Sequence, residues 1–289
     1  YDDVSADHAM MGATIFDPSN TNNGNSTGAA QLMANSLFTP IILGVPQPTA
    51  AGATAIQPFL NRNTTWVGYN TRFNNSVKYI TPNFGGFSGS LMYGFGEDKT
   101  ASAPATATTA AVVGVGATKV WSGNLKYANG PLVISGGYQS ETTPGSRTTT
   151  LEPALQNTLL NVAYDFGVVK LGFGANRAKY KDVIVPVNVV TGRAAHEVAP
   201  QKEYSLSLAI PLGATTVSMG YARSKGDDLG SSTGYGIQAL YSLSKRTTLY
   251  VGGQSTKNYD GIANAVNTYY PGSNISRTTT YAAGMRHTF

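Results

Sequence analysis

From residue 72 to its C-terminus, the chain alternates between apolar and polar residues in segments of about ten residues. In the final segment, Tyr281, Ala283 and Met285 are separated by small or cationic residues. A period of two residues places neighbouring side chains on opposite faces of a β-strand. About eleven segments show this pattern. The sequence therefore predicts an all-β chain whose strands each have one apolar face and one polar face.

The connections between these segments alternate between short turns and long loops. Asn129-Gly130 and Asp165-Phe166-Gly167 mark short turns, because Asn, Asp and Gly favour tight turn geometry. The connections at 97–116 and 182–201 are much longer. This regularity is typical of antiparallel β-barrels that span an outer membrane, with the short turns on the periplasmic side. A soluble β-sandwich is the alternative, although it has no reason to keep such regular alternation.

Composition supports the membrane barrel over the soluble sandwich. Charged residues make up 12% of the chain, about half the usual share for a soluble domain. No apolar run approaches the roughly 18 residues that a transmembrane helix needs. The formal net charge of +5 is modest, and no cluster of Lys and Arg indicates a nucleic-acid partner. The absence of cysteine excludes disulfides and thiolate metal sites.

Residues 1 to 70 lack the alternation of the rest. They contain an Asn/Gly/Ser/Thr tract at 18–28 and a possible short helix at 29–38. Segments this long without regular structure are usually functional or disordered. The chain opens on Tyr1 without the basic and apolar regions of a signal peptide. We therefore expect that a leader was removed or that the natural start lies elsewhere.

The sequence offers no arrangement for catalysis. The three histidines, His8, His196 and His287, lie far apart in the chain. A nucleophile and a base cannot be paired among them, and they are too scattered to indicate a metal site. We expect neither an enzyme nor a cofactor.

Two stretches carry a family resemblance. Residues 72–79 read Arg-Phe-Asn-Asn-Ser-Val-Lys-Tyr, and residues 81–89 read Thr-Pro-Asn-Phe-Gly-Gly-Phe-Ser-Gly. The ending Gly284 to Phe289 and the turn at 243–247 are similar to the same proteins. These motifs resemble the general porins of β-proteobacteria, of the Neisseria, Burkholderia and Comamonas type.

The resemblance implies a transmembrane barrel of about sixteen strands in the complete protein. In that family the third extracellular loop folds into the pore and narrows it. The sequence 1–289 would then be a single porin domain. Residues 1–70 would be the constriction-loop segment and residues 71–289 strands six to sixteen, with five N-terminal strands absent from this sequence.

The polar set of alternating positions carries cationic side chains that would line an aqueous interior. Fixed positive charge in a narrow passage favours anions, because it is poorly screened there. The resemblance implies that Arg72 belongs to a basic cluster at the constriction, with loop carboxylates opposite. The candidates for the pore wall and the constriction are Arg72, Asn74, Lys78, Lys126, Arg286, Asp2, Asp3 and Asp7.

Simpler roles are open for several of these residues. Arg72 would equally hold the loop in place by pairing with one of its carboxylates. Lys78 and Lys126 lie near short turns and would be solvated at the rim. Lys170 falls on the same polar set, as does Lys119, where the alternation slips.

Aromatic residues fall mostly on the apolar set. Tyrosines there are typical of the girdles at the two membrane–water interfaces. The candidates for these girdles are Tyr79, Tyr93, Tyr127, Tyr164, Tyr241 and Phe289.

The sequence therefore predicts a passive diffusion channel in the outer membrane of a Gram-negative bacterium. It would admit small hydrophilic solutes and ions with a mild preference for anions, so that small anionic or neutral solutes are its expected cargo. A channel selective for organic acids or phosphate is one alternative. A non-conducting barrel that acts as an adhesin or structural anchor is the other. Expected partners are two further copies in a homotrimer, outer-membrane lipid including lipopolysaccharide, and the barrel-assembly machinery, which would bind Phe289.

Overall fold

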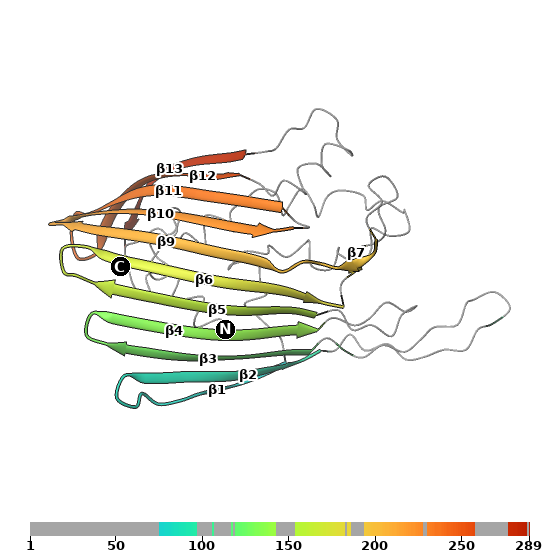
Figure 1. The fold of residues 1–289 in the computed structure, drawn as a ribbon. Coiled ribbons are helices and arrows are strands. Elements are labelled where there is room, and N and C mark those ends of the chain that lie inside the picture. Colours follow the sequence, from blue (N-terminus) through green and yellow to red (C-terminus); the bar gives the residue numbers. More distant parts are fainter. Residues whose placement is uncertain are drawn as a thin grey trace.

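The computed structural model describes residues 75–96, 106, 117, 119–142, 154–182, 184–185, 194–227, 230–257, 277–287 and 289. Their main feature is a single antiparallel sheet of eleven strands (Figure 1). Each strand pairs with its neighbours in chain order, except that β6 pairs with β9. The strands are β1 (Ser76–Ile80), β2 (Phe87–Phe95), β3 (Lys119–Asn129), β4 (Leu132–Thr142), β5 (Ala154–Asp165), β6 (Lys170–Lys181), β9 (Gln201–Leu212), β10 (Thr215–Gly226), β11 (Gly230–Ser242), β12 (Thr247–Lys257) and β13 (Arg277–His287).

The predicted eleven strands are thus confirmed. A difference lies in the connection between β6 and β9, which was expected to be a loop. There β7 (Ile184–Val185) and β8 (His196–Glu197) form a separate two-stranded sheet. Two residues are too few to produce a recognisable alternation in the sequence. No helix among the described residues is long and apolar enough to cross a membrane.

Short turns gather at one end of the sheet, the left end in Figure 1, and four of the five connections at the other end are longer. The exception there is the connection between β10 and β11, which consists of residues 227–229. We call the two ends the short-turn end and the long-loop end. Asn129 pairs with Leu132 across the first predicted turn, and Gly130 there has a φ of 54°. Gly167 and Gly213 also have positive φ, at 82° and 64°. Glycine adopts this left-handed geometry without the steric cost that a Cβ brings.

The two faces of the sheet differ in both polarity and exposure. In β9, Gln201, Glu203 and Ser205 are 0–3% exposed, whereas Tyr204 and Leu206 are 50% and 56% exposed. We call the buried polar side the inner face and the exposed apolar side the outer face. A soluble sandwich buries its apolar face, so this arrangement is reversed with respect to water-soluble folds.

The same reversal is found along the other strands. Leu125 of β3 is 61% exposed and Met285 of β13 is 63% exposed. Ser122 of β3 and Gln238 of β11 are 5% and 2% exposed. The soluble alternative required the apolar set to form a dry centre, and it is therefore wrong. An exposed apolar surface of this extent suits contact with hydrocarbon.

Aromatic side chains on the outer face form two belts that flank an aliphatic band. In β11, Tyr235 lies toward the long-loop end and Tyr241 toward the short-turn end, with Ile237 between them. Two pairs of aromatic rings in contact near the short-turn end are Phe87–Tyr127 and Tyr164–Phe166, with ring centroids 4.6 and 4.5 Å apart. Two near the long-loop end are Tyr93–Phe95 and Trp121–Tyr138, both at 4.7 Å.

Candidate functional site

The inner face is built from every second residue of adjacent strands. The sheet register places Ser122 opposite Gln139, and Gln139 opposite Asn157, so that small polar side chains form rows across β3, β4 and β5. All three are at most 5% exposed. Such a wall is hydrophilic although it is buried, which requires hydrogen-bond partners for its polar atoms.

Some of these buried polar atoms have no hydrogen-bond partner among the described residues. Examples are the Oγ atom of Ser135, the Oδ1 atom of Asn157, and both side-chain polar atoms of Gln238. In a dry interior each unpaired group would cost about 1–3 kcal/mol. The inner face therefore has the chemistry of a wall that contacts water.

A hydrogen-bonded cluster joins β6, β9 and β10 near the long-loop end. Asn176 Nδ2 donates to Glu203 Oε2 at 2.7 Å, and Ser224 Oγ donates to Glu203 Oε1 at 3.0 Å. Gln201 Nε2 donates to Ser224 Oγ at 2.9 Å. Glu203 is fully buried. These bonds hold the carboxylate against the wall and offset part of the cost of its burial.

Two inner carboxylates were missed by the sequence reasoning. Glu141 and Glu203 are 2% and 0% exposed and lie on the inner face near the long-loop end. The sequence could have identified Glu203. Tyr204 and Leu206 lie on the outer face, and Glu203 alternates with them, so it lies on the inner face.

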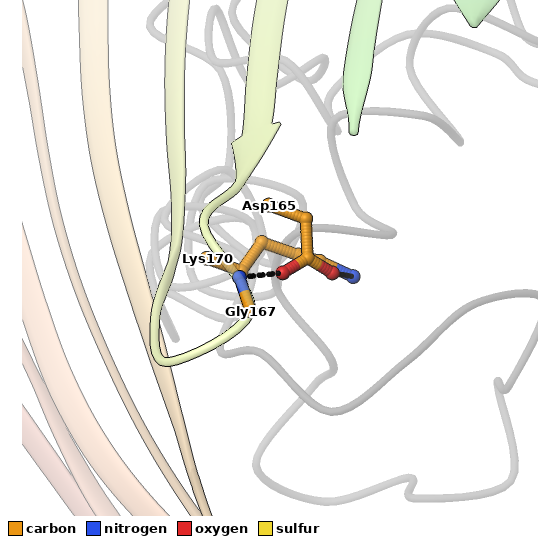
Figure 2. Close-up of polar contacts among 3 residues, drawn as sticks. All are labelled: Asp165, Gly167 and Lys170. Atoms are coloured by element: carbon orange, nitrogen blue, oxygen red, sulfur yellow. Dashed lines mark hydrogen bonds and ion pairs between the residues drawn. The ribbon is translucent and has the colours of Figure 1, made fainter. Parts of the chain in front are cut away.

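Three of the predicted inner cations are described by the structure. Lys78 lies opposite Met92, and Lys126 lies opposite Ser135, both on the inner face. Lys170 is at the short turn between β5 and β6 (Figure 2). Its Nζ atom lies 3.3 Å from Asp165 Oδ2, while the Gly167 N–H donates to Asp165 Oδ1 at 2.9 Å. The charge of Lys170 is thus balanced within its own turn.

Lys119 differs from its assignment to the polar set. It lies opposite Phe95 in the register and is exposed on the outer face, where Trp121 is its neighbour on that side. Val120 between them is buried at 2% exposure. The reason is that an apolar residue occupies an inner position here, so polarity alone assigns the face wrongly.

Several candidates lie outside the described residues. They are Arg72, Asn74, Asp2, Asp3 and Asp7, together with the whole segment 1–70 and the helix predicted at 29–38. Arg286 lies opposite Thr248 in the register, but its side chain is outside the described part of the chain. Among the described residues, no group of three or more His, Asp or Glu side chains is placed to hold a metal ion.

The aromatic candidates are on the outer face. Tyr79, Tyr93, Tyr164 and Tyr241 are between 39% and 63% exposed. Tyr127 is partly covered, because its ring stacks on Phe87. Phe289 is fully exposed beyond the end of β13, and its ring centroid lies 5.0 Å from that of His287.

The family model for Gram-negative porins matches residues 13–261. The chain belongs to the Gram-negative porin family. Its place is therefore the outer membrane, and the resemblance inferred from the sequence motifs is confirmed.

Two curated porins and one solved structure are similar to the chain. Outer membrane porin protein 32 of Delftia acidovorans is 30% identical over 82% of this chain and 64% of its own length. An outer membrane porin protein of Bordetella pertussis is 27% identical over 75% of this chain and 58% of its own length. The anion-selective porin from Comamonas acidovorans is 28% identical with a TM-score of 0.54, covering 75% of this chain and 60% of that one.

This porin chain therefore spans less than two thirds of the length of each of these relatives. The proteins it resembles are porins, a class of channel proteins rather than enzymes. The eleven strands of this porin correspond to part of the barrel that such relatives form.

Proposed function

We propose that the complete protein is a passive diffusion channel for small hydrophilic solutes and ions. The observation that carries the proposal is the inner face, a largely polar wall on which Ser135, Asn157 and Gln238 have buried polar atoms without a hydrogen-bond partner among the described residues. Such a wall is stable when it lines an aqueous passage. Membership of the porin family supports the same function.

We also propose a mild preference for anions. Lys78 and Lys126 are on the inner face, and Lys170 is neutralised by Asp165. We propose that Arg286 also belongs to these cations of the inner face. Glu203 opposes it, although its hydrogen bonds and burial keep it away from a passing ion. A relative at 28% identity is described as an anion-selective porin, which agrees with this preference.

The proposed constriction follows from the family resemblance. Residues 1–70 would fold into the barrel, and strands of 71–289 would be the sixth to the sixteenth of sixteen. Arg72 and Asn74 would lie on the wall at the narrowest point. Asp2, Asp3 and Asp7 would face them and produce a transverse field. Solutes would then be sorted by size and by charge at the same level of the pore.

Reconstitution of the complete protein into planar lipid bilayers tests the channel proposal. We expect stepwise conductance and, in a KCl gradient, a reversal potential with the sign of chloride permeation. A folded protein that produces no conductance would contradict the proposal and favour an adhesin or anchor. Saturable block by an organic acid or by phosphate would instead favour the substrate-selective channel.

We propose a homotrimer as the assembled form and Phe289 as the contact of the barrel-assembly machinery. The fully exposed ring of Phe289, which lies edge-to-face against His287, is accessible to such a partner. Analytical ultracentrifugation in detergent measures the assembled mass. Removal of Phe289 is expected to lower the amount of folded protein in the outer membrane, with total synthesis unchanged. Equal membrane levels would contradict this role.

A further inference from the structure

Six cationic side chains lie together on the outer face, at the long-loop ends of β6, β9 and β10. We call them the outer basic patch. All six are exposed. They are Arg177, Lys179 and Lys181 of β6, Lys202 of β9, and Arg223 and Lys225 of β10. None of them belongs to the candidate pore wall, because the inner positions of these strands alternate with them.

The register brings like charges directly opposite each other. Arg177 lies opposite Lys202, and Lys202 lies opposite Lys225, so that three cations form one row across three strands. Like charges in directly opposed positions destabilise a sheet unless something balances them. A row of this kind is therefore unfavourable without an anionic partner.

Carboxylates in the described part of the chain do not balance this row. Lys181 Nζ lies 3.8 Å from Asp182 Oδ2, at one margin of the patch. Asp227 is exposed at the other margin, after the end of β10. Among the described residues, no carboxylate is within ion-pair distance of Arg177, Lys202 or Lys225. The centre of the patch keeps its positive charge.

The patch lies immediately beyond an aromatic belt. Tyr204 is opposite both Arg223 and Ala175, and the next row toward the short-turn end begins with Phe173. Along the outer face the order is thus aliphatic, aromatic, cationic. These are the levels of hydrocarbon, interface and lipid head groups in a bilayer.

Charge on the outer face is also asymmetric between the two ends. The remaining cationic positions on this face in the described strands, Lys119, Lys257 and Arg277, are at the long-loop end as well. At the short-turn end, the outer-face positions of the described strands carry neither Lys nor Arg. Because short turns are periplasmic in outer-membrane barrels, the cations face the outer leaflet.

We propose that the outer basic patch binds the phosphate groups of a lipopolysaccharide head group in the outer leaflet. Arg177 offers a planar fork that matches phosphate oxygens, and Lys202 and Lys225 place further charge beside it. The acyl chains of the same lipid would lie along the aliphatic band below the aromatic belt. The binding site rests on the placement of the porin in the outer membrane and is independent of its conductance.

The test compares two double variants of the complete protein with equal loss of charge. Arg177→Gln/Lys202→Gln removes the centre of the patch. Lys245→Gln/Arg246→Gln removes two exposed cations from the turn before β12, at the opposite end of the sheet. Binding of purified lipopolysaccharide is measured in nanodiscs of neutral phospholipid. The first variant is expected to bind about 30-fold more weakly, because the loss of each cation weakens binding by about fivefold. The control is expected to stay within about twofold of the parent protein.

Further binding experiments decide which group of the lipid the patch recognises. Lipopolysaccharide with its phosphates removed should bind the parent protein as weakly as the double variant binds the intact lipid. Inorganic phosphate at matched concentration should not displace the lipid. Equal affinity of the two double variants, equal binding of the dephosphorylated lipid, or displacement by free phosphate would each overturn the proposal.

Folding and conductance serve as independent readouts. Heat-dependent migration in gels reports the folded state, and bilayer conductance is expected to be unchanged in both double variants. Should Arg177→Gln/Lys202→Gln fail to fold, Lys225→Gln alone replaces it, with an expected loss of about fivefold. Arg177→Lys, which keeps the charge, is expected to retain most of the affinity. Full affinity in Lys225→Gln would equally overturn the proposal.

Discussion

Glu203 is held by polar neighbours rather than by a cation. Asn176 and Ser224 each donate one hydrogen bond to a different oxygen of its carboxylate, and Gln201 supports Ser224 from the next position on the inner face. A buried acidic group is tolerated only when such partners are present. The cluster joins β6, β9 and β10 at a point where the outer face of the same strands carries dense positive charge.

Removing one partner of Glu203 should destabilise the barrel. In Asn176→Ala, Glu203 Oε2 loses its donor, and we expect the free energy of unfolding to fall by about 1–3 kcal/mol. The measurement is denaturant unfolding of the refolded protein in detergent. In a Glu203→Gln background the same substitution should cost less, because the carboxylate is gone. Equal costs in the two backgrounds would show that the hydrogen bond is not responsible.

Lys126 and Lys119 offer a matched test of the two faces, because they lie on the same strand and face opposite sides. Lys126→Gln should lower the ratio of chloride to potassium permeability by roughly twofold, since it removes a fixed charge beside the passage. Lys119→Gln, on the outer face, should leave this ratio unchanged. Reversal potentials in a KCl gradient provide the measurement. Equal effects of the two substitutions would contradict the inner-face assignment.

Among the elements, the short turns explain why the strands pair in their observed register. Gly130 adopts a φ of 54°, and a Cβ there would meet nothing within 4 Å. Gly86 has a φ of 94°, and a Cβ there would lie 2.8 Å from the Ala128 carbonyl oxygen and 3.2 Å from the Tyr127 ring. The Ala128 N–H also donates to the Gly86 carbonyl at 2.9 Å. Both turns need glycine, for different reasons.

Alanine substitution should separate these two requirements. Gly130→Ala is expected to cost about 1 kcal/mol of unfolding free energy, from backbone conformation alone. Gly86→Ala adds a steric conflict with the backbone of β3 and should cost more. The same denaturant unfolding experiment compares them. A larger loss for Gly130→Ala would contradict the explanation based on contact.

The strands also show what the sequence can and cannot predict. A period of two residues is a strong signal, and all eleven long strands were predicted from it. The pair β7 and β8 was not, because two residues have no period. Lys119 was assigned to the wrong face, because the apolar Val120 occupies the neighbouring inner position. Glu203 was overlooked, although its alternation with Tyr204 and Leu206 in the same strand places it on the inner face.

The site is less predictable than the fold. Sequence alternation assigns a face to Lys126 or Lys170, but it does not reveal that Asp165 and Gly167 hold Lys170 in its turn. Cross-strand rows such as Arg177, Lys202 and Lys225 depend on register, which single strands do not specify. The residues proposed for the constriction, Arg72 among them, remain predictions.

At the scale of the whole molecule, the two aromatic belts define how the sheet sits in the membrane. Trp121 is 49% exposed on the outer face and stacks on Tyr138 near the long-loop end. Leu125 lies four residues further along β3 on the same face, within the aliphatic band. At about 3.4 Å per residue, these two positions are about 14 Å apart along the strand.

Lipid quenching should distinguish these two depths. Residues 1–289 contain Trp66 and Trp121, so a variant in which Trp66 and any tryptophan outside these residues are replaced by Phe isolates Trp121. In bilayers of brominated lipids, Trp121 fluorescence is expected to be quenched most by bromine near the head groups. With Trp121→Phe and Leu125→Trp added, quenching should be strongest for bromine deeper in the acyl chains. Absence of quenching in both variants would contradict contact between the outer face and lipid.

The belts also set the depth of the sheet in the membrane, whatever the amino-acid sequence of its long connections. The segment between β2 and β3 leaves the sheet beyond Phe95 and returns before Trp121. Because the short turns of outer-membrane barrels are periplasmic, we expect a foreign peptide inserted there to be displayed to antibodies on the cell surface. The tyrosines and the tryptophan would still anchor the sheet at its original level, so the chain offers a scaffold for presenting epitopes on living bacteria.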